Sequence, residues 1–279
     1  MSRPALALLA AVVLAGLAHP AAAAEDKALK TAIAGPWRAP DSVARDKARH
    51  PYESLVFWGV KPKETVIELS PGNGYWTEIL APYAKATGGH YLASGADLDN
   101  PKVSEGAKKA RAAFAAKYAD KATYGEIGVV NFGAVSKTLG PPGSADVVLT
   151  ARNIHNWLWS PPMLDKVMTD SFAVLKPGGV LAVEEHRADP RPQVGDARDG
   201  YVAVATVVAA AEKAGFKLDA KSEINANPKD TKDYVYGVWT LPPTRQSTKD
   251  ENVADPAFDH TKYDAIGESD RMTLRFRKP

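Results

Sequence analysis

The sequence contains no cysteine and carries almost no net charge. Its 279 residues include 35 basic and 33 acidic side chains, which give a formal charge of +2. The missing cysteines exclude disulfides, thiolate zinc sites and cysteine nucleophiles. The small and interspersed charge leaves no basic footprint for a nucleic acid, so we expect no nucleic-acid partner. Nothing in the sequence specifies an oligomeric state.

The chain also lacks an apolar run of the roughly 20 residues that a membrane-spanning helix needs. The run Ala5–Ala18 is shorter, follows Arg3 and precedes the small residues Ala22–Ala24. This pattern is typical of a secretory signal peptide, here residues 1–24. It predicts a periplasmic or secreted protein without stable membrane insertion after cleavage. A retained membrane anchor is the alternative.

Residues 25–279 are expected to form one α/β domain. β-branched runs alternate with helical patterns from Val66 to Ala220. This alternation predicts βαβ units and a doubly wound, mostly parallel seven-stranded sheet with helices on both faces. Residues 25–60 are expected to be helical, and the polar residues 225–268 a long loop or insertion. The predicted strands are Val66–Leu69, His90–Ser94, Ile127–Phe132, Ala145–Thr150, Val180–Val183, Phe216–Ala220 and Met272–Phe276. The predicted central helices are Tyr75–Ala86, which Pro82 should kink or shorten, Lys102–Tyr118, Met163–Leu175 and Tyr201–Ala214.

A glycine-containing turn follows the first predicted strand. It runs Glu68-Leu69-Ser70-Pro71-Gly72-Asn73-Gly74 and opens a helix. Ligands of open parallel sheets bind at the carboxyl ends of the strands, and glycines there allow close backbone approach. A dinucleotide fingerprint would need a third glycine where Thr77 stands, which argues against a nicotinamide oxidoreductase. An ordinary tight turn is the remaining alternative.

Six segments, in this order and at this spacing, carry a resemblance to a known family. They are Arg49–Pro51, Val66–Leu80, Asp146–Trp157, Leu175–Gly179, Asn227–Pro228 and Arg275–Pro279. Together they make residues 40–279 resemble the class I S-adenosylmethionine (SAM)-dependent methyltransferases, and most of all a bacterial group of methyltransferases that often carry leader peptides. The resemblance implies a Rossmann-like methyltransferase fold, SAM as cofactor, and methyl transfer to a small molecule or an envelope component.

The resemblance also implies roles for single residues. Gly72 and Gly74 would lie against the methionine part of SAM, and Glu68 would anchor that part. The family usually has glycine where Ser70 stands. Asp97 would bind the ribose hydroxyls, although the interposed Ser-Gly-Ala departs from the usual compact pattern. The implied cofactor-binding residues are Glu68, Ser70, Pro71, Gly72, Asn73, Gly74, Asp97, Asn131, Phe132 and Arg152.

Polar residues crowd the segment after the fourth predicted strand, where methyl transfer would take place. A hydroxyl or amine acceptor needs a base that works near neutral pH, and histidine suits this role. The predicted catalytic residues are His155 as the first choice of base, His186 as the second, and Asn153. A structural or helix-capping histidine is the alternative for His155.

Two further alternatives concern metal binding and loss of catalysis. His50, His155, Glu185 and His186 could ligate a metal, but no short ligand spacing supports this, so we expect none. Strand alternation should also place Glu185 and His186 on opposite faces. Because SAM is made in the cytoplasm, an exported chain could instead be a catalytically inactive methyltransferase-like protein that binds a ligand or partner.

Overall fold

The computed structural model describes residues 25–160, 162–190, 192–193 and 195–279. The predicted signal peptide, residues 1–24, lies outside the described residues. Within them, seven strands form one sheet with the order β3-β2-β1-β4-β5-β7-β6. Only β7 runs antiparallel to its neighbours β5 and β6. The predicted mostly parallel sheet is therefore confirmed. The strands are β1 Thr65–Leu69, β2 His90–Ala96, β3 Ile127–Phe132, β4 Ala145–Ala151, β5 Leu175–His186, β6 Lys217–Ser222 and β7 Arg271–Arg277.

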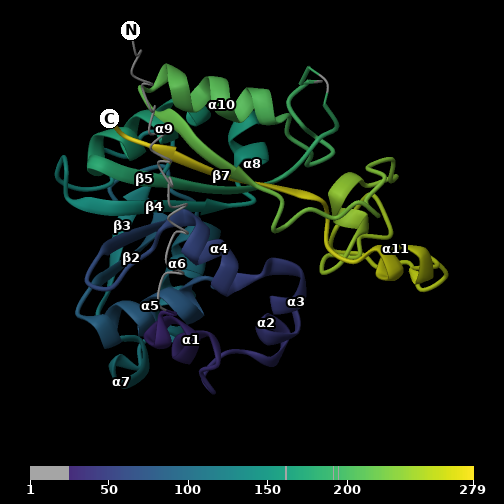
Figure 1. Ribbon diagram of the computed structural model, residues 1–279. Helices are drawn as coiled ribbons and strands as arrows, with labels where there is room; N and C mark the ends of the chain where they lie inside the picture. Colours follow the sequence, from purple (N-terminus) through teal and green to yellow (C-terminus); the bar gives the residue numbers. More distant parts are fainter. Residues whose placement is uncertain (1–24, 161, 191, 194) are drawn as a thin grey trace, which may run out of the picture.

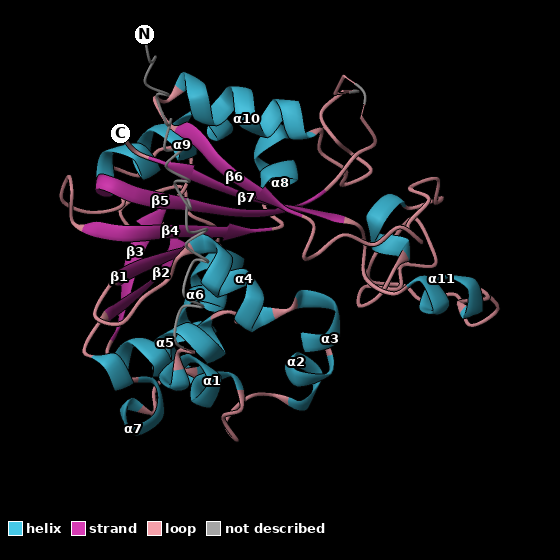
Figure 2. Cartoon of the chain, viewed as in Figure 1, coloured by secondary structure: helices cyan, strands magenta, loops and turns pink. Residues whose placement is uncertain are grey.

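Helices cover both faces of this sheet, as Figures 1 and 2 show. Helices α1, α4, α5, α6 and α7 lie on one face, and α8, α9 and α10 lie on the other. The helices are α1 Lys27–Ile33, α2 Pro40–Ala44, α3 Asp46–Arg49, α4 Pro51–Trp58, α5 Thr77–Thr87, α6 Glu105–Lys117, α7 Lys121–Tyr124, α8 Ile154–Leu158, α9 Met163–Val174, α10 Val204–Lys213 and α11 Thr261–Ile266, with a 3₁₀ turn η1 at Gly237–Thr240. Among the described residues, no helix has both the length and the apolar character to cross a membrane.

The alternation of side chains along each strand builds two hydrophobic cores. Ile67 and Leu69 of β1 pack with Val207 of α10 on one face. Val66 packs with Ile79 of α5 on the other. Parallel strands buried on both faces are apolar in nearly every position, which explains the continuous runs in the sequence. The two covered faces leave the strand ends as the place where polar side chains gather.

Helix α5 passes through Pro82 and continues to Thr87, so of the two predicted effects of this proline, a kink or a shortened helix, the shortening does not occur. Proline has no N–H, and the carbonyl four residues earlier therefore loses its helical partner. That carbonyl belongs to Glu78, and Nε1 of Trp37 donates a hydrogen bond to it at 2.9 Å. The amino-terminal segment thus satisfies the group that the proline orphans, and the helix persists.

Residues 225–268, predicted to be a long loop or insertion, contain short helices. The 3₁₀ turn η1 and the helix α11 both lie in this segment. The segment extends beyond the edge where β5 ends and β7 begins, as Figure 1 shows. Asp230 fastens it there, because its carboxylate accepts hydrogen bonds from the Tyr201 hydroxyl at 2.9 Å and the Asp270 amide at 2.7 Å.

Candidate functional site

Two adjoining cavities lie at the carboxyl ends of the central strands. The strand order changes direction between β1 and β4, which is where open α/β sheets bind ligands. The polar cavity has a volume of about 360 Å³ and is lined by polar residues that include Arg49, Arg152 and His155. The apolar cavity has a volume of about 320 Å³. Both cavities share the turn residues Ser70, Pro71 and Gly72.

The shared turn has the backbone conformation of a glycine turn, although serine occupies its first position. Ser70 has a φ of 48°, in the left-handed region that glycine adopts freely. Its amide donates a hydrogen bond to Oγ of Ser94 at 2.7 Å, which fixes it against β2. A Cβ built on Gly72 would meet nothing within 4 Å. The turn therefore presents bare backbone to both cavities.

Gly74 has a different role from Gly72. A Cβ at Gly74 would lie 1.8 Å from the hydroxyl oxygen of Tyr118. That hydroxyl donates to the carbonyl of Asn73 at 3.1 Å. Asn73 lines the polar cavity, whereas Gly74 lines neither cavity. The close approach that requires glycine at this position is thus made by Tyr118 of the chain itself.

Glu68, at the end of β1, is a buried carboxyl that lines the polar cavity. Its Oε2 accepts hydrogen bonds from Oγ1 of Thr77 at 3.1 Å and from the hydroxyl of Tyr91 at 2.5 Å. Burial raises the pKa of Glu68 to about 7, because a desolvated carboxylate loses the stabilisation that water gives its charge. The group can therefore present either a carboxyl or a carboxylate near neutral pH.

The three residues predicted to bind the nucleoside differ in placement. Phe132 lines the apolar cavity, and its ring lies edge-on to that of Trp157 with centroids 5.9 Å apart. Asp97 and Asn131 line neither cavity. The Asp97 carboxylate accepts the amide of Asp99 at 3.1 Å, and the side chain of Asn131 accepts from Arg111. The apolar cavity is instead lined on this side by Ser94, Gly95 and Ala96 of β2.

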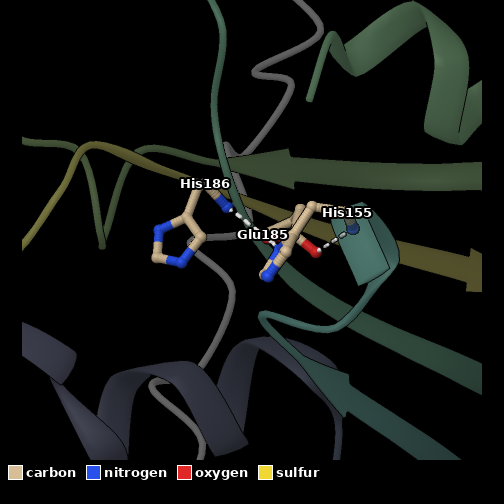
Figure 3. Close-up of side chains that lie close together, drawn as sticks. All are labelled: His155, Glu185 and His186. Atoms are coloured by element: carbon tan, nitrogen blue, oxygen red, sulfur yellow. Dashed lines mark hydrogen bonds and ion pairs between the residues drawn. The ribbon is translucent and has the colours of Figure 1, made fainter. Parts of the chain in front are cut away.

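His155 and Glu185 form a buried pair beside the polar cavity (Figure 3). Nδ1 of His155 lies 3.0 Å from Oε1 of Glu185, and the carboxylate also accepts the amides of Ile154 at 2.5 Å and His155 at 3.3 Å. Glu185 therefore holds the amino-terminal end of α8 as well as the imidazole. Because a carboxylate only accepts, Nδ1 carries the proton and Nε2 keeps a free lone pair. The helix-capping group is Glu185 rather than His155.

His186 faces the polar cavity from the end of β5, while Glu185 lies under α8. Of these two neighbours only His186 lines the cavity, although ligand atoms of both lie within 4.8 Å of one another. Nδ1 of His186 lies 2.5 Å from Oγ of Ser269, and its ring centroid is 5.4 Å from that of His155. Burial, followed by the nearby His155 and three arginines, lowers the pKa of His186. This imidazole is therefore neutral at physiological pH.

Three of the four candidate metal ligands lie together, and His50 does not. Ligand atoms of His155, Glu185 and His186 lie within 4.8 Å of one another. Nδ1 of His50 is instead 3.3 Å from Oδ1 of Asn225. The Glu185 oxygens already accept the amides of residues 154, 155 and 186 and Nδ1 of His155. Because the Glu185 carboxylate already accepts these hydrogen bonds, it is better suited to orient the His155 imidazole than to ligate a metal.

Asn153 and Arg152 follow β4 and take different roles. Nδ2 of Asn153 donates to the carbonyls of Leu69 and Ala151, both at 3.1 Å, and so ties the ends of β1 and β4 together. Arg152 has a φ of 60°, and its amide donates to the carbonyl of Glu184 at 2.8 Å. A non-glycine residue held in this region is strained, and such strain occurs often at functional sites.

Several lining residues were not singled out by the sequence. Arg45 and Arg49 come from the amino-terminal helices, Trp239 from η1, and Glu268 from the approach to β7. Trp239 lies 5.8 Å from the His155 ring, centroid to centroid. These residues are far apart along the chain and meet only in the fold. The motif Arg49-His50-Pro51 was the one available signal for this part of the cavity.

No protein-family model and no curated protein matches the chain. Among solved structures, the chain is similar to a SAM-dependent methyltransferase from Aquifex aeolicus, with 18% identity, 65% of this chain and 87% of that chain covered, and a TM-score of 0.50. It is also similar to the [4+2]-cyclase SpnF, with 15% identity, 90% and 92% covered, and a TM-score of 0.54. The chain thus has the class I methyltransferase fold, a fold that does not by itself fix the reaction.

Proposed function

We propose that the chain is an exported SAM-dependent methyltransferase that acts on a small-molecule or envelope substrate in the periplasm or outside the cell. One observation carries the proposal. The bare turn at Gly72 and the imidazole of His155 line the same polar cavity, at the switch in strand order. A cofactor-binding turn and a base facing one cavity are the two parts that methyl transfer to a hydroxyl or amine requires.

The residues present fit a sulfonium nucleoside. The apolar cavity adjoins the turn and carries the rings of Phe114 and Phe132, which suit a nucleobase. Gly72 leaves backbone open at the junction, and Glu68 offers a hydrogen-bonding carboxyl on the polar side. When bound, SAM supplies a methyl group on a positively charged sulfur. Glu68, Ser70 and Gly72 would hold its amino-acid part, and Phe132 its base.

His155 would take the proton from the acceptor. Its Nε2 has a free lone pair because Nδ1 donates to Glu185. The same carboxylate stabilises the imidazolium that forms when the proton arrives. The rings of Trp159 and Trp239 lie 5.6 and 5.8 Å from the imidazole, and the His155 residue is only 4% exposed. Neutral His186 adds no charge that would oppose proton transfer.

Calorimetry with SAM and S-adenosylhomocysteine tests the proposal. We expect the purified chain to bind both with micromolar affinity, and Gly72→Leu to lose that binding while it stays folded. Native mass spectrometry of fresh material offers a second measurement, since a retained nucleoside would add its mass. A folded chain that binds neither nucleoside would contradict the proposal and favour a catalytically inactive binding protein. Export is tested by the mass of the periplasmic form, expected to begin at residue 25.

A further inference from the structure

Three arginines converge on the polar cavity from distant parts of the chain. Arg45 directly precedes α3, Arg49 is the last residue of α3, and Arg152 follows β4. The Arg49 side chain is 0% exposed, and both of its Nη nitrogens lack a hydrogen-bond partner among the described residues. Nη2 of Arg45 and Nε of Arg152 are unpartnered within the same part of the chain. A buried guanidinium with unused donors is costly unless a ligand satisfies them.

Two carboxylates, Glu184 and Glu268, lie near these arginines, and Glu184 is paired with Arg271 at 2.7 Å. Glu268 is shared by three guanidiniums, with distances of 2.6 Å to Arg45, 3.1 Å to Arg49 and 3.0 Å to Arg271. For Arg152, no ion pair with another described residue forms. The surplus positive charge also opposes a divalent cation at the adjacent histidines. An anionic group is therefore the chemistry that completes this side of the cavity.

We propose that Arg45, Arg49 and Arg152 form a subsite for a carboxylate or phosphate group of the molecule bound in the polar cavity. This inference rests on the proposed function and narrows its ligand class. Planar guanidinium forks bind such oxygen pairs with two parallel hydrogen bonds. The anionic group has two possible sources, the amino-acid end of the cofactor and an acidic acceptor. Since the subsite and His155 line one cavity, an acidic acceptor would carry its anionic group beside the hydroxyl or amine that is methylated.

Calorimetry with two nucleosides separates the sources. S-adenosylhomocysteine carries a carboxylate, and 5′-methylthioadenosine lacks it. Malonate and inorganic phosphate, titrated into protein saturated with S-adenosylhomocysteine, probe an acidic acceptor. The variants are Arg49→Met, which leaves Glu268 paired with Arg45 and Arg271, and Arg45→Met in case the first does not fold. Arg187→Met is the matched control, because it removes an ion pair with Asp270 outside the polar cavity.

If the cofactor is the source, Arg49→Met weakens the affinity for S-adenosylhomocysteine at least tenfold and changes the affinity for methylthioadenosine by no more than twofold. If the acceptor is the source, both nucleosides keep their affinity, and binding of malonate or phosphate to the saturated protein is lost. Unchanged affinity for every probe in Arg49→Met and Arg45→Met would overturn the subsite. If the wild type binds neither nucleoside, the methyltransferase proposal is refuted but the subsite is not. Malonate and phosphate titrated into the free protein then test the subsite: binding that Arg49→Met abolishes supports it, and no binding overturns it.

Discussion

Oε1 of Glu185 lies 3.0 Å from Nδ1 of His155, while Oε2 of the same carboxylate accepts two amides of α8. One side chain therefore fixes the tautomer of the imidazole and the position of the helix that carries it. Because both partners are buried, the arrangement has little freedom to relax when either is changed.

We expect His155→Ala to lower methyl transfer by about 10²–10⁴-fold, the usual contribution of a general base, and to leave cofactor affinity within about twofold. Glu185→Gln should also lower transfer, because its NH₂ would place a donor either against the amides of α8 or against Nδ1–H of His155. The measurement is transfer of labelled methyl from SAM into an envelope extract, with calorimetry alongside. His90→Ala, at the exposed amino end of β2, is the control. Undiminished transfer by His155→Ala would remove this residue from the mechanism.

The two glycines of the turn should respond differently to leucine. At Gly72 the new side chain enters open space that a ligand would use, so binding is lost, and the melting temperature falls only by the cost of a left-handed backbone at φ 56°. At Gly74 the side chain collides with Tyr118, so the melting temperature falls strongly. Calorimetry and thermal unfolding of both variants separate these effects. Equal stability of the two variants would show that Tyr118 does not pack as the structure has it.

Ser70→Gly should stabilise the protein or leave it unchanged, since serine pays about 1 kcal/mol for its left-handed backbone. Ser70→Val should destabilise it, because a β-branched residue tolerates this conformation least. Both variants keep the backbone amide that bonds to Ser94. Chemical denaturation gives the two free energies of unfolding. A Ser70→Gly variant less stable than Ser70→Val would contradict the assigned conformation.

The raised pKa of Glu68 predicts a specific pH dependence of stability. The folded state, with a pKa of about 7 against 4.5 unfolded, binds more protons between these values. Its stabilising contribution is therefore full below pH 4.5 and lost as the pH rises through 7, by up to about 3 kcal/mol. We expect the free energy of unfolding of the wild type to fall relative to Glu68→Gln between pH 5 and 8. A constant difference between the two proteins would show that Glu68 is not perturbed.

A double-mutant cycle tests the bond between Trp37 and the Glu78 carbonyl. Trp37→Phe removes the donor and should cost about 1–2 kcal/mol beyond the loss of ring packing. In a Pro82→Ala background the new amide can reach the same carbonyl, so Trp37→Phe should cost less. Thermal and chemical unfolding of the four proteins give the coupling energy. Additive costs would mean that the indole does not compensate for the proline.

The sheet and the turn could be predicted from the sequence because their signals are local. β-branched runs mark the strands. Gly72 follows β1 and His155 follows β4, and the carboxyl ends of parallel strands lie at the same edge of the sheet. Long-range packing carries no such signal. The roles of Gly74, set by Tyr118 44 residues away, and of Glu185, set by the amides of α8, required the structure. Asp97, where the sequence departs from the usual compact pattern, lines neither cavity.

Trp239 lines the polar cavity from the 3₁₀ turn η1, which is not part of the sheet. It rests against His155 yet contributes no strand to the framework that holds the turn at Gly72. Replacing residues 237–244 would therefore change the part of the polar cavity near His155, and with it the acceptors that can bind. The turn at Gly72, which would hold the cofactor, would stay unchanged. Chimaeras that swap residues 237–244 would then retain cofactor affinity and differ in the compounds they modify.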